Sequence, residues 1–567
     1  MEKVTIDLTS LIAEKRYEEF KKAIADAQPG VTFVIEKGVY DIDMGFTQPG
    51  FYYVSNNGGG VKNIFFPIRH KKDIEIDFSG ATLIFHGLIF PFVIDQSEGI
   101  TLRNFSVKYS DTFYLQGKIL KKEGESLTIA CSNRAKYCFE GSDLILSGEG
   151  WERNFSEAVG LVQEFDGVLH RVAYRAPVLV CKFTESDKVR SSIPLALNTL
   201  LLQPAGEGMI RISGNKNDYF TEGNQLVLSV MGRETDIFLI NDSKDTVIEN
   251  VNIYNGSAMG VIGQVSENIT LNRVRIMREE GASDIISTLA DATHFVNCSG
   301  RIVMKDCVFE NMLDDATNIH GIFTGVSEIL SDSEVIVTLG HEQQFGVNIY
   351  KPGDRVSILK GCTNVVKGSI IVVSSELIGE NRIRLQISGD TEKLSEGDHL
   401  ENDFRMPEIY ISGCKTGNNR PRGFIVASSK KTVIENCVFY NSDAGVATYG
   451  DVCYWFESGR VSDVTIRNNL FLECNYQCGE ACIVVKPEVE CEGDGCFHKN
   501  YKVYGNRVVT NSGTILSAYG VDGVLVENNT LQWGKTYPNH KAPVVLAENC
   551  KNVTERNNRF AEEEISG

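Results

Sequence analysis

The sequence predicts an all-β fold: a right-handed parallel β-helix with two inserted antiparallel, barrel-like β domains. An eight-residue phrase recurs nine times, with apolar residues at alternating positions and a polar residue, usually Asn, in fourth place. The alternation predicts a strand with one buried face, and the Asn predicts a sharp turn because Asn tolerates left-handed backbone. Steps of 22 to 38 residues within each contiguous run are typical of a solenoid. The phrases occupy 101–108, 247–254, 270–277, 303–310, 433–440, 465–472, 503–510, 525–532 and 554–561.

Other repeat folds fit this pattern less well. Leucine-rich repeats need a Leu framework with tighter spacing, and propeller blades need about four strands in each period of roughly 40 residues. In a parallel β-helix, by contrast, one Asn in each coil is expected to stack into an internal ladder. The repeat therefore favours the β-helix.

The other elements follow from where the phrase is present and where it is missing. Residues 11–27 place apolar and charged residues at helical spacing, which predicts a helix that caps the open end of the solenoid. The two long gaps in the repeat alternate apolar and polar residues between turn signals, so each is interpreted as an inserted β domain. The expected order is cap and first coils 1–117, first inserted domain 118–236, coils 237–321, second inserted domain 322–408 and C-terminal coils 409–567.

Charge and hydropathy exclude several classes of partner. With 56 Lys and Arg against 75 Asp and Glu, the net charge is −19, which disfavours binding to a nucleic-acid backbone and, more weakly, to anionic polysaccharides. No apolar run approaches the roughly 20 residues that span a bilayer. The first seven residues lack a basic and apolar leader, so we expect a cytoplasmic protein, or a secreted or periplasmic one if a leader has been trimmed.

The fifteen cysteines are scattered, and several lie inside predicted strands. The densest patch lacks a paired C-x2-C spacing, so we expect buried thiols and no metal site, and leave open one loop disulfide. This patch consists of Cys474, Cys478, Cys482, Cys491 and Cys496.

The densest polar cluster contains Asp291, His294, Asp314, Asp315 and His320. Asp291 and Asp314 are 23 residues apart, close to one coil, and neighbouring rungs of a β-helix lie about 4.8 Å apart. Carboxyl groups that close raise at least one pKa, which yields a general acid beside a general base. The alternative for the paired Asp is a solvated turn or a calcium site. The histidines, beside three carboxyl groups, are candidate contacts for sugar hydroxyls.

Later residues extend this candidate site. Asn318 lies in the same cluster, and Arg420 and Arg422 would bind sugar hydroxyls or hold carboxylates. Trp455, beside Glu457, suits the apolar face of a sugar ring, although packing on the helix surface is an equally good explanation. We predict substrate contacts for all five.

Several runs of the sequence resemble glycoside hydrolase family 110, the bacterial α-1,3-galactosidases. The matching runs are 76–80, 85–87, 91–92, 290–295, 313–321, 420–423 and 455–459. The resemblance implies a β-helix with inserted β-barrel domains and hydrolysis of terminal α-1,3-linked galactose with inversion, without a cofactor. It implies a galactose-terminated glycan as partner, either the blood-group B trisaccharide or linear Galα1-3Gal. It makes Asp291, Asp314 and Asp315 the catalytic carboxyls; we assign Asp291 as acid and one of the other two as base.

Two alternatives remain. One is another inverting β-helix hydrolase similar to the polygalacturonases, although their Asn-Thr-Asp and Arg-Ile-Lys runs are not found. The other is a non-catalytic, carbohydrate-binding β-helix, which would have no reason to concentrate carboxylates on successive coils. A homodimer is compatible with either architecture.

Overall fold

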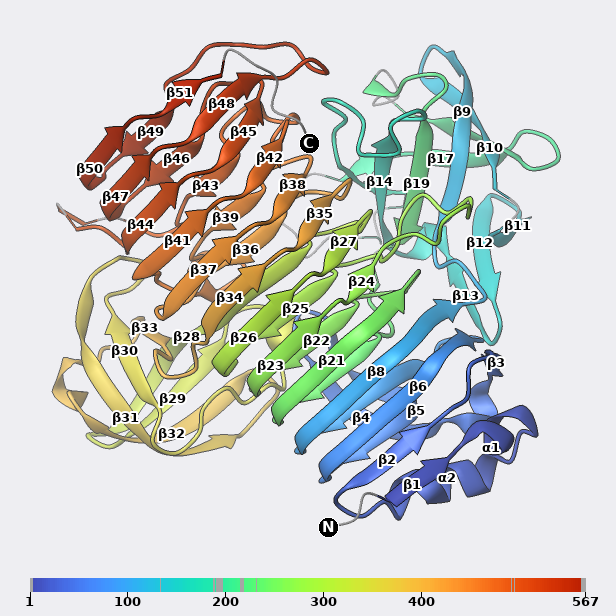
Figure 1. The fold of residues 1–567 in the computed structure, drawn as a ribbon, viewed down its shortest axis with the longest axis horizontal. Coiled ribbons are helices and arrows are strands. Elements are labelled where there is room, and N and C mark those ends of the chain that lie inside the picture. The colour runs from blue at the N-terminus through green and yellow to red at the C-terminus, as the bar shows by residue number, and fades with distance from the viewer. Residues whose placement is uncertain are drawn as a thin grey trace.

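The structure is a computed structural model that describes residues 4–561 except 133, 187, 188, 190–196, 215–218, 231, 491 and 494. Figure 1 shows a right-handed parallel β-helix that runs the length of the molecule, with one inserted β domain on each side of it. The predicted fold class is confirmed. None of the helices in these ranges has the length and hydropathy needed to cross a bilayer.

Most coils of the solenoid contribute two strands to one long sheet, with a bend between them, and one strand to a second sheet; in three early coils one long strand replaces the pair. Adjacent coils pair in parallel: Leu271 lies opposite Met304, and both are fully buried. The strands of the first sheet are β1 (Val4–Asp7), β2 (Val31–Val34), β3 (Val39–Ile42), β6 (Lys72–Phe85), β8 (Glu98–Tyr109), β21 (Lys244–Ile253), β23 (Glu267–Asn272), β24 (Arg275–Ile276), β26 (Ser299–Lys305), β27 (Val308–Glu310), β34 (Glu408–Ser412), β35 (Lys415–Gly417), β37 (Lys431–Glu435), β38 (Val438–Tyr440), β41 (Asp463–Arg467), β42 (Leu470–Leu472), β44 (His498–Tyr504), β45 (Arg507–Thr510), β47 (Val521–Glu527), β48 (Thr530–Trp533), β50 (Lys551–Arg556) and β51 (Arg559–Phe560).

The second sheet carries the face on which the polar cluster lies. Its parallel strands are β5 (Gly58–Arg69), β7 (Phe90–Asp95), β20 (Phe238–Asn241), β22 (Val261–Gln264), β25 (Thr293–Val296), β28 (Thr317–Ser331), β36 (Phe424–Val426), β39 (Val446–Thr448), β43 (Ile483–Val485), β46 (Leu516–Tyr519) and β49 (Val545–Glu548). β4 (Gln48–Val54) forms a hairpin with β5, and β40 (Glu457–Ser458) pairs antiparallel with β28.

The turn predicted at the fourth place of the phrase is present. In eight of the nine copies this residue has a positive φ, between 51° and 63°; in the ninth, Gly505 takes the left-handed conformation just before the Asn. A tenth copy, Tyr410–Gly417, escaped the pattern because Gly413 replaces the polar residue there. The eight are Asn104, Asn250, Arg273, Asp306, Asn436, Asn468, Asn528 and Asn557.

The internal ladder is formed by the residue that directly follows the left-handed one, which is one position later than predicted in three of its four members. Asn469, Asn506, Asn529 and Asn558 stack on successive coils, and each Nδ2 donates to the next Oδ1 at 3.1, 3.0 and 2.9 Å. The turn residue itself points outward, as at the exposed Asn468. In earlier coils the ladder place holds buried cysteines with free thiols, so several strand cysteines belong to the core, as expected. These are Cys307, Cys414 and Cys437.

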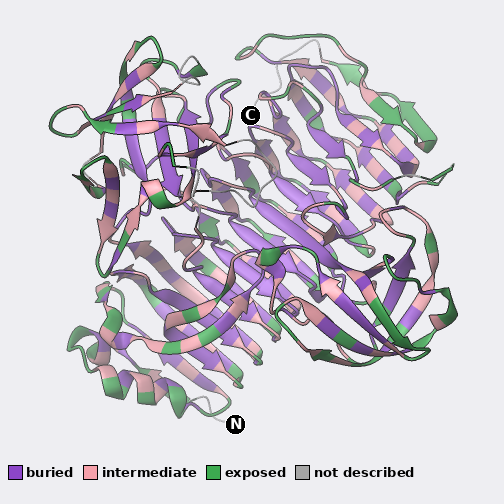
Figure 2. Ribbon diagram, turned by 180° about the vertical axis from the view of Figure 1, so that it is seen from behind, coloured by how far each residue is buried: buried purple, intermediate pink, exposed green. Residues whose placement is uncertain are grey.

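Two short helices, α1 (Thr9–Ala13) and α2 (Tyr17–Ala25), lie at the N-terminal end of the solenoid (Figure 1). α2 buries Phe20, whose ring stacks on Phe65 of β5 with centroids 5.0 Å apart. At the other end, Figure 2 shows the last coil largely exposed, and every residue of β50 and β51 is exposed. The helices therefore cover apolar surface that the first coil would otherwise present to water.

The strands of the first insertion run from β9 (Leu115–Glu123) to β19 (Gln225–Val230). Eight of them form an open sheet in the order β16-β15-β14-β19-β9-β10-β18-β17, and β11-β12-β13 form a separate antiparallel sheet. This insertion is therefore not a closed barrel among the described strands. The strands between β9 and β19 are β10 (Ser126–Cys131), β11 (Lys136–Glu140), β12 (Asp143–Gly148), β13 (Trp151–Asn154), β14 (Val159–Phe165), β15 (Leu179–Lys182), β16 (Asn198–Thr199), β17 (Leu201–Pro204) and β18 (Met209–Ser213).

The second insertion is a closed antiparallel barrel. β28 begins as a rung of the solenoid at Thr317, leaves it after the rung residues, and continues into the barrel to Ser331. The circuit runs β28-β29-β32-β31-β30-β33 and returns to β28. One strand thus joins the candidate site to the insertion. The other barrel strands are β29 (Glu334–Leu339), β30 (Arg355–Leu359), β31 (Val366–Leu377), β32 (Arg382–Gly389) and β33 (His399–Glu401).

Candidate active site

The site lies on the outer face of β25 and β28, two neighbouring rungs of the second sheet. His294 pairs with Asn318, while Phe295 and Ile319 point into the hydrophobic core. The same register places Asp291 opposite Asp315, each just before its strand, and the backbone N–H of Ala292 donates to the Asp315 carbonyl at 3.0 Å. Rung pairing therefore brings two carboxyl groups together that lie 24 residues apart in the sequence.

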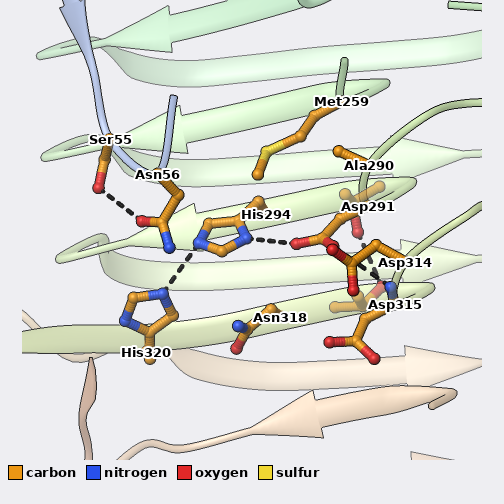
Figure 3. A network of polar contacts seen from close by, with 12 residues as sticks. Ser55, Asn56, Met259, Ala290, Asp291, His294, Asp314, Asp315, Asn318 and His320 are labelled. Carbon is orange, nitrogen blue, oxygen red and sulfur yellow. Dashed lines mark hydrogen bonds and ion pairs between the residues drawn. The ribbon is translucent and has the colours of Figure 1, made fainter. Parts of the chain in front are cut away.

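Three carboxyl groups gather at this edge (Figure 3). One oxygen from each of Asp291, Asp314 and Asp315 lies within 4.8 Å of the other two. Asp291 and Asp315 are 3% exposed, whereas the side chain of Asp314 is 20% exposed. The cluster thus has two buried carboxyl groups, and Asp314 opens it to solvent.

Arginines hold two of the three carboxyls. Arg422 makes a two-pronged contact with Asp315, at 2.9 Å from Nε and 2.8 Å from Nη2, and its backbone N–H donates to the same carboxyl at 3.1 Å. Asp314 lies 3.1 Å from Nη2 of Arg233 and 3.7 Å from Nη2 of Arg420. Each of these contacts to the Asp315 carboxyl oxygens comes from an N–H donor, which favours its ionised form.

Asp291 has a different environment. No arginine in the described part of the chain contacts it; its Oδ2 lies 2.5 Å from Nδ1 of His294, and its Oδ1 accepts the Asp315 backbone N–H at 3.3 Å. Burial, and then the charge of Asp314, raises the pKa of Asp291 well above its usual value. Burial also raises the pKa of Asp315 to about 7, although Arg422 acts to lower it. The two carboxyls that face each other across one rung therefore differ in their tendency to hold a proton.

Behind Asp291 lies a buried histidine pair. Nε2 of His294 is 2.9 Å from Nε2 of His320 (Figure 3). Nδ1 of His320 is 2.6 Å from the Gly321 carbonyl oxygen. Burial, and then His320, lowers the pKa of His294 well below its usual value. Glu457 lies 3.5 Å from Nε2 of His320; burial raises the pKa of Glu457, but the two histidines outweigh it and lower that pKa overall.

A hairpin turn that sequence analysis did not single out closes one side of the site. Asn56, between β4 and β5, donates through Nδ2 to Glu457 at 3.3 Å, and its carbonyl accepts from Arg233 at 2.8 Å. Its side chain is fixed by Ser55, whose Oγ donates to Oδ1 of Asn56 at 2.9 Å (Figure 3). Gln264 of β22 accepts the Ser55 backbone N–H at 2.9 Å. The hairpin thereby positions an arginine and a carboxylate at once.

The second insertion borders the site next to this hairpin, since the backbone N–H of Asn56 donates to the Gln343 carbonyl at 2.7 Å. The ring of Trp455 packs against the ring of His341, with centroids 4.8 Å apart. His341 directly precedes the short 3-10 helix η4 (Glu342–Gln344) of the second insertion. His341 is close enough to Glu457 and Arg233 for their charges to act on it. Trp455 is partly exposed and its carbonyl accepts from Gln344 at 2.7 Å. The predicted tryptophan therefore flanks the carboxyl cluster, and its contact with a sugar stays a prediction.

The structure brings all ten predicted residues into one region through direct contacts or a shared neighbour. Asn318 donates to Glu457 at 3.1 Å, and its buried Oδ1 has no hydrogen-bond partner in the described part of the chain. Arg420 and Arg422 contact carboxylates, one of the two roles expected of them. Arg233, Asn56 and His341 were missed because each is a single residue outside the repeat, and no local pattern marks them.

Two groups place potential metal ligands within 4.8 Å of one another: His294, His320 and Glu457, and the three aspartates. The histidine Nε2 atoms already face each other at hydrogen-bond distance, and arginines face Asp314 and Asp315, which disfavours a cation. We therefore assign no metal here.

The C-terminal cysteine patch does not contribute a ligand group among the described residues. Cys474, Cys478 and Cys482 have free thiols, two of them buried, and Cys491 lies outside the described residues.

Comparison with known proteins gives a consistent result. Residues 345–531 match the family model described as right-handed beta helix region. Alpha-1,3-galactosidase A of Shewanella woodyi is 31% identical over 552 residues, covering 95% of this chain and 87% of that protein. Alpha-1,3-galactosidase B of Bacteroides thetaiotaomicron is 29% identical, covering 94% and 86%.

Among solved structures, the Yersinia enterocolitica family 28 exopolygalacturonase matches with 10% identity and a TM-score of 0.34, covering 98% of this chain and 79% of that one. The sequence relatives carry the assignment, because the identity to the Shewanella protein extends over nearly the whole chain. The chain belongs to the α-1,3-galactosidase family of glycoside hydrolases.

Proposed function

We propose that the protein releases terminal α-1,3-linked galactose from oligosaccharides by hydrolysis with inversion, acting on the blood-group B trisaccharide, on linear Galα1-3Gal, or on both. One observation carries the proposal: three carboxyl groups from two coils meet at the solvent-facing edge of a sheet, in environments that separate their proton affinities. Family membership supplies the substrate class.

Asp291 is the proposed general acid. Its burial and the neighbouring charge of Asp314 favour the protonated form, and no arginine among the described residues contacts it. An acid that holds its proton near pH 7 can protonate the leaving glycosidic oxygen as the bond breaks.

Asp314 is the better candidate for the general base. It is the most exposed of the three carboxyls, so a water can reach it, whereas both oxygens of Asp315 are occupied by Arg422. The contact with Arg233 pairs Asp314 with a positive charge while leaving it open to solvent. In this assignment Asp315 positions its neighbours. The unpartnered Oδ1 of Asn318 would accept a sugar hydroxyl.

The separation of the carboxyls bears on stereochemistry. Inverting pairs usually lie about 6.5–9.5 Å apart, and retaining pairs about 5–5.5 Å apart. The nearest oxygens here are within 4.8 Å, below the inverting range that rung spacing with a sideways offset was expected to give. The proposal of inversion therefore rests on the resemblance to an inverting family, and it requires Asp314 to move away from Asp291 when sugar and water enter.

The test is galactose release from Galα1-3Gal and from the B trisaccharide, with proton NMR of the first anomer formed. We expect β-galactose first, and loss of at least about 10³-fold in kcat for Asp291→Asn and Asp314→Asn with the fold retained. Asp306→Asn is a matched control, because Asp306 is a turn residue away from the cluster. Wild-type rates in the aspartate variants would refute the site.

The other outcomes are equally informative. The α-anomer as first product would refute inversion while leaving hydrolysis intact. Release of galacturonate from polygalacturonate would favour the alternative hydrolase, and sugar binding without turnover would favour a binding protein. A homodimer stays a prediction that light scattering checks.

A further inference from the structure

The histidine pair was expected to contact sugar hydroxyls, but its geometry indicates another role. His294 and His320 are each 2% exposed, and all four ring nitrogens have a partner in the protein. The contacts form a chain: Asp291 Oδ2 to His294 Nδ1 at 2.5 Å, His294 Nε2 to His320 Nε2 at 2.9 Å, and His320 Nδ1 to the Gly321 carbonyl at 2.6 Å. The chain begins at the proposed acid and ends at the backbone.

The hydrogen positions along this chain follow from donor and acceptor chemistry. The Gly321 carbonyl only accepts, so Nδ1 of His320 carries a hydrogen. If His320 is neutral, its Nε2 is then bare and must accept from Nε2–H of His294. A neutral His294 with its hydrogen on Nε2 has a bare Nδ1, which needs a donor. Among the residues that the structure describes, the group at this nitrogen is Asp291, which can donate only when it is protonated.

We propose that His320 acts through His294 to keep the acid proton on Asp291, so that both histidines are positioning residues rather than sugar contacts. The inference rests on the proposed function for its catalytic consequence, but not for its structural claim. The Gly321 carbonyl fixes the tautomer of His320, and that tautomer fixes the one of His294. The bare Nδ1 of His294 is then a hydrogen-bond acceptor, so Asp291 must be the donor.

The charged groups around Asp291 do not by themselves explain a firmly held proton. Asp314 and Glu457 favour protonation of Asp291, whereas Arg233 and Arg422 oppose it. Burial disfavours charge on both Asp291 and His294, so the neutral acid–imidazole pair is preferred over carboxylate and imidazolium. The histidine chain presents only an acceptor to Asp291 and so favours its protonated form, whereas the surrounding charges act in both directions.

Glu457 is the competing partner for His320. Its Oε1 is 3.5 Å from Nε2 of His320, farther than the 2.9 Å to His294, and it already faces Nδ2 of Asn56 at 3.3 Å. Its Oε2 accepts from Asn318 at 3.1 Å. The nearest partner of the His320 nitrogen is therefore the other ring.

The first test needs no catalysis. Histidine labelled with ¹⁵N in the intact wild-type protein reports each tautomer through long-range proton–nitrogen correlations. At pH 7 we expect His320 as the Nδ1–H form and His294 as the Nε2–H form, with assignments from His320→Gln and His294→Gln. His294 as the Nδ1–H form, or either ring doubly protonated at pH 7, would overturn the proposal. The result stands even if the protein releases no galactose.

The second test reads the pH profile of kcat/KM on Galα1-3Gal. His320→Phe keeps ring volume but removes both nitrogens, so His294 is free to donate to an ionised Asp291. The alkaline limb should then move down by about one pH unit, roughly a 10-fold loss on that limb. His320→Gln can still accept from His294 and should restore the limb. His399→Gln is a matched control, since His399 also directs Nδ1 at a carbonyl, that of Gly361 at 2.9 Å, in the barrel.

The two failures are distinguishable. An active enzyme whose alkaline limb is the same in wild type and His320→Phe refutes the histidine role alone. Absence of galactose release with the expected tautomers refutes the proposed function alone.

Discussion

Replacing Arg422 by Met should destabilise the protein in a way that depends on pH above 7. The guanidinium contacts both oxygens of Asp315, which is almost fully buried, and Met retains much of the apolar stem. In the wild type, burial raises the pKa of Asp315 to about 7 even though Arg422 lowers it. Without Arg422 the pKa of Asp315 lies above 7, and the folded variant keeps a proton that the folded wild type loses.

The size of the effect follows from proton linkage. An unfolded Asp has a pKa of about 3.9, so the unfolded chain binds no proton at Asp315 above pH 7. Because the folded pKa is raised, the stability contributed by the protonated form is lost as pH rises through that pKa. Between pH 7 and the Asp315 pKa of the variant, titration of Asp315 no longer changes the unfolding free energy of the wild type. Over the same range the unfolding free energy of the variant falls by about 1.4 kcal/mol per pH unit. Below pH 7 Asp315 is protonated in both proteins, and only the loss of hydrogen bonds separates them.

The assay is urea unfolding of wild type, Arg422→Met, Asp315→Asn and the double variant at pH 6, 7, 8 and 9. The stability difference between wild type and Arg422→Met should be flat up to pH 7 and then grow. The same difference measured in the Asp315→Asn background should be flat throughout, because Asn does not titrate. A difference that does not change from pH 6 to 9, or one that grows equally in the Asn background, would refute the pairing of Arg422 with the charge of Asp315.

Three further predictions follow from the same contacts. Asn506→Ala should cost about 3 kcal/mol or more by urea unfolding, because it leaves several buried ladder groups unpaired, whereas Asn272→Ala, which loses one bond to Glu249, should cost about 1 kcal/mol. Phe20→Ala should lower unfolding free energy by about 3–5 kcal/mol, since its fully buried ring fills the cap against Phe65; a change under 1 kcal/mol would show that the helices do not protect the first coil. EDTA should leave the galactose-release rate unchanged, because arginines and hydrogen bonds occupy the clustered ligand atoms; loss restored by a divalent ion would contradict this.

Most of the fold could be predicted from the repeat, because the residues that form each turn are neighbours in the sequence. Each coil contains its own left-handed turn residue and its own alternation of apolar and polar residues, so nine copies could be found without any contact information. The ladder was placed one residue early because a sequence such as Asn468-Asn469 offers two amides, and only packing shows which one faces inward. The copy around Gly413 was invisible because glycine reaches the same backbone conformation without the polar side chain.

The residues of the candidate site also fall into two groups, those that sequence spacing could reveal and those that only the folded chain brings together. Asp291, His294 and Asn318 were found because they lie on neighbouring rungs with coil-like spacing. Arg233 lies in the segment between β19 and β20, Asn56 lies in a hairpin turn, and their partners are 81 and 401 residues away along the chain. No periodicity connects such positions, so they become apparent only when the chain is folded.

This division also explains how one face can hold two neighbouring carboxyls of different proton affinity. Parallel rungs are equivalent, and their backbone pairing brings Asp291 and Asp315 together whatever their charge. Left alone, two such carboxyls would share one proton without preference. The partners that distinguish them are not themselves equivalent: Asp291 faces a histidine and Asp315 faces Arg422. Proximity therefore comes from the repeat, and the difference in proton affinity comes from which partner each carboxyl meets.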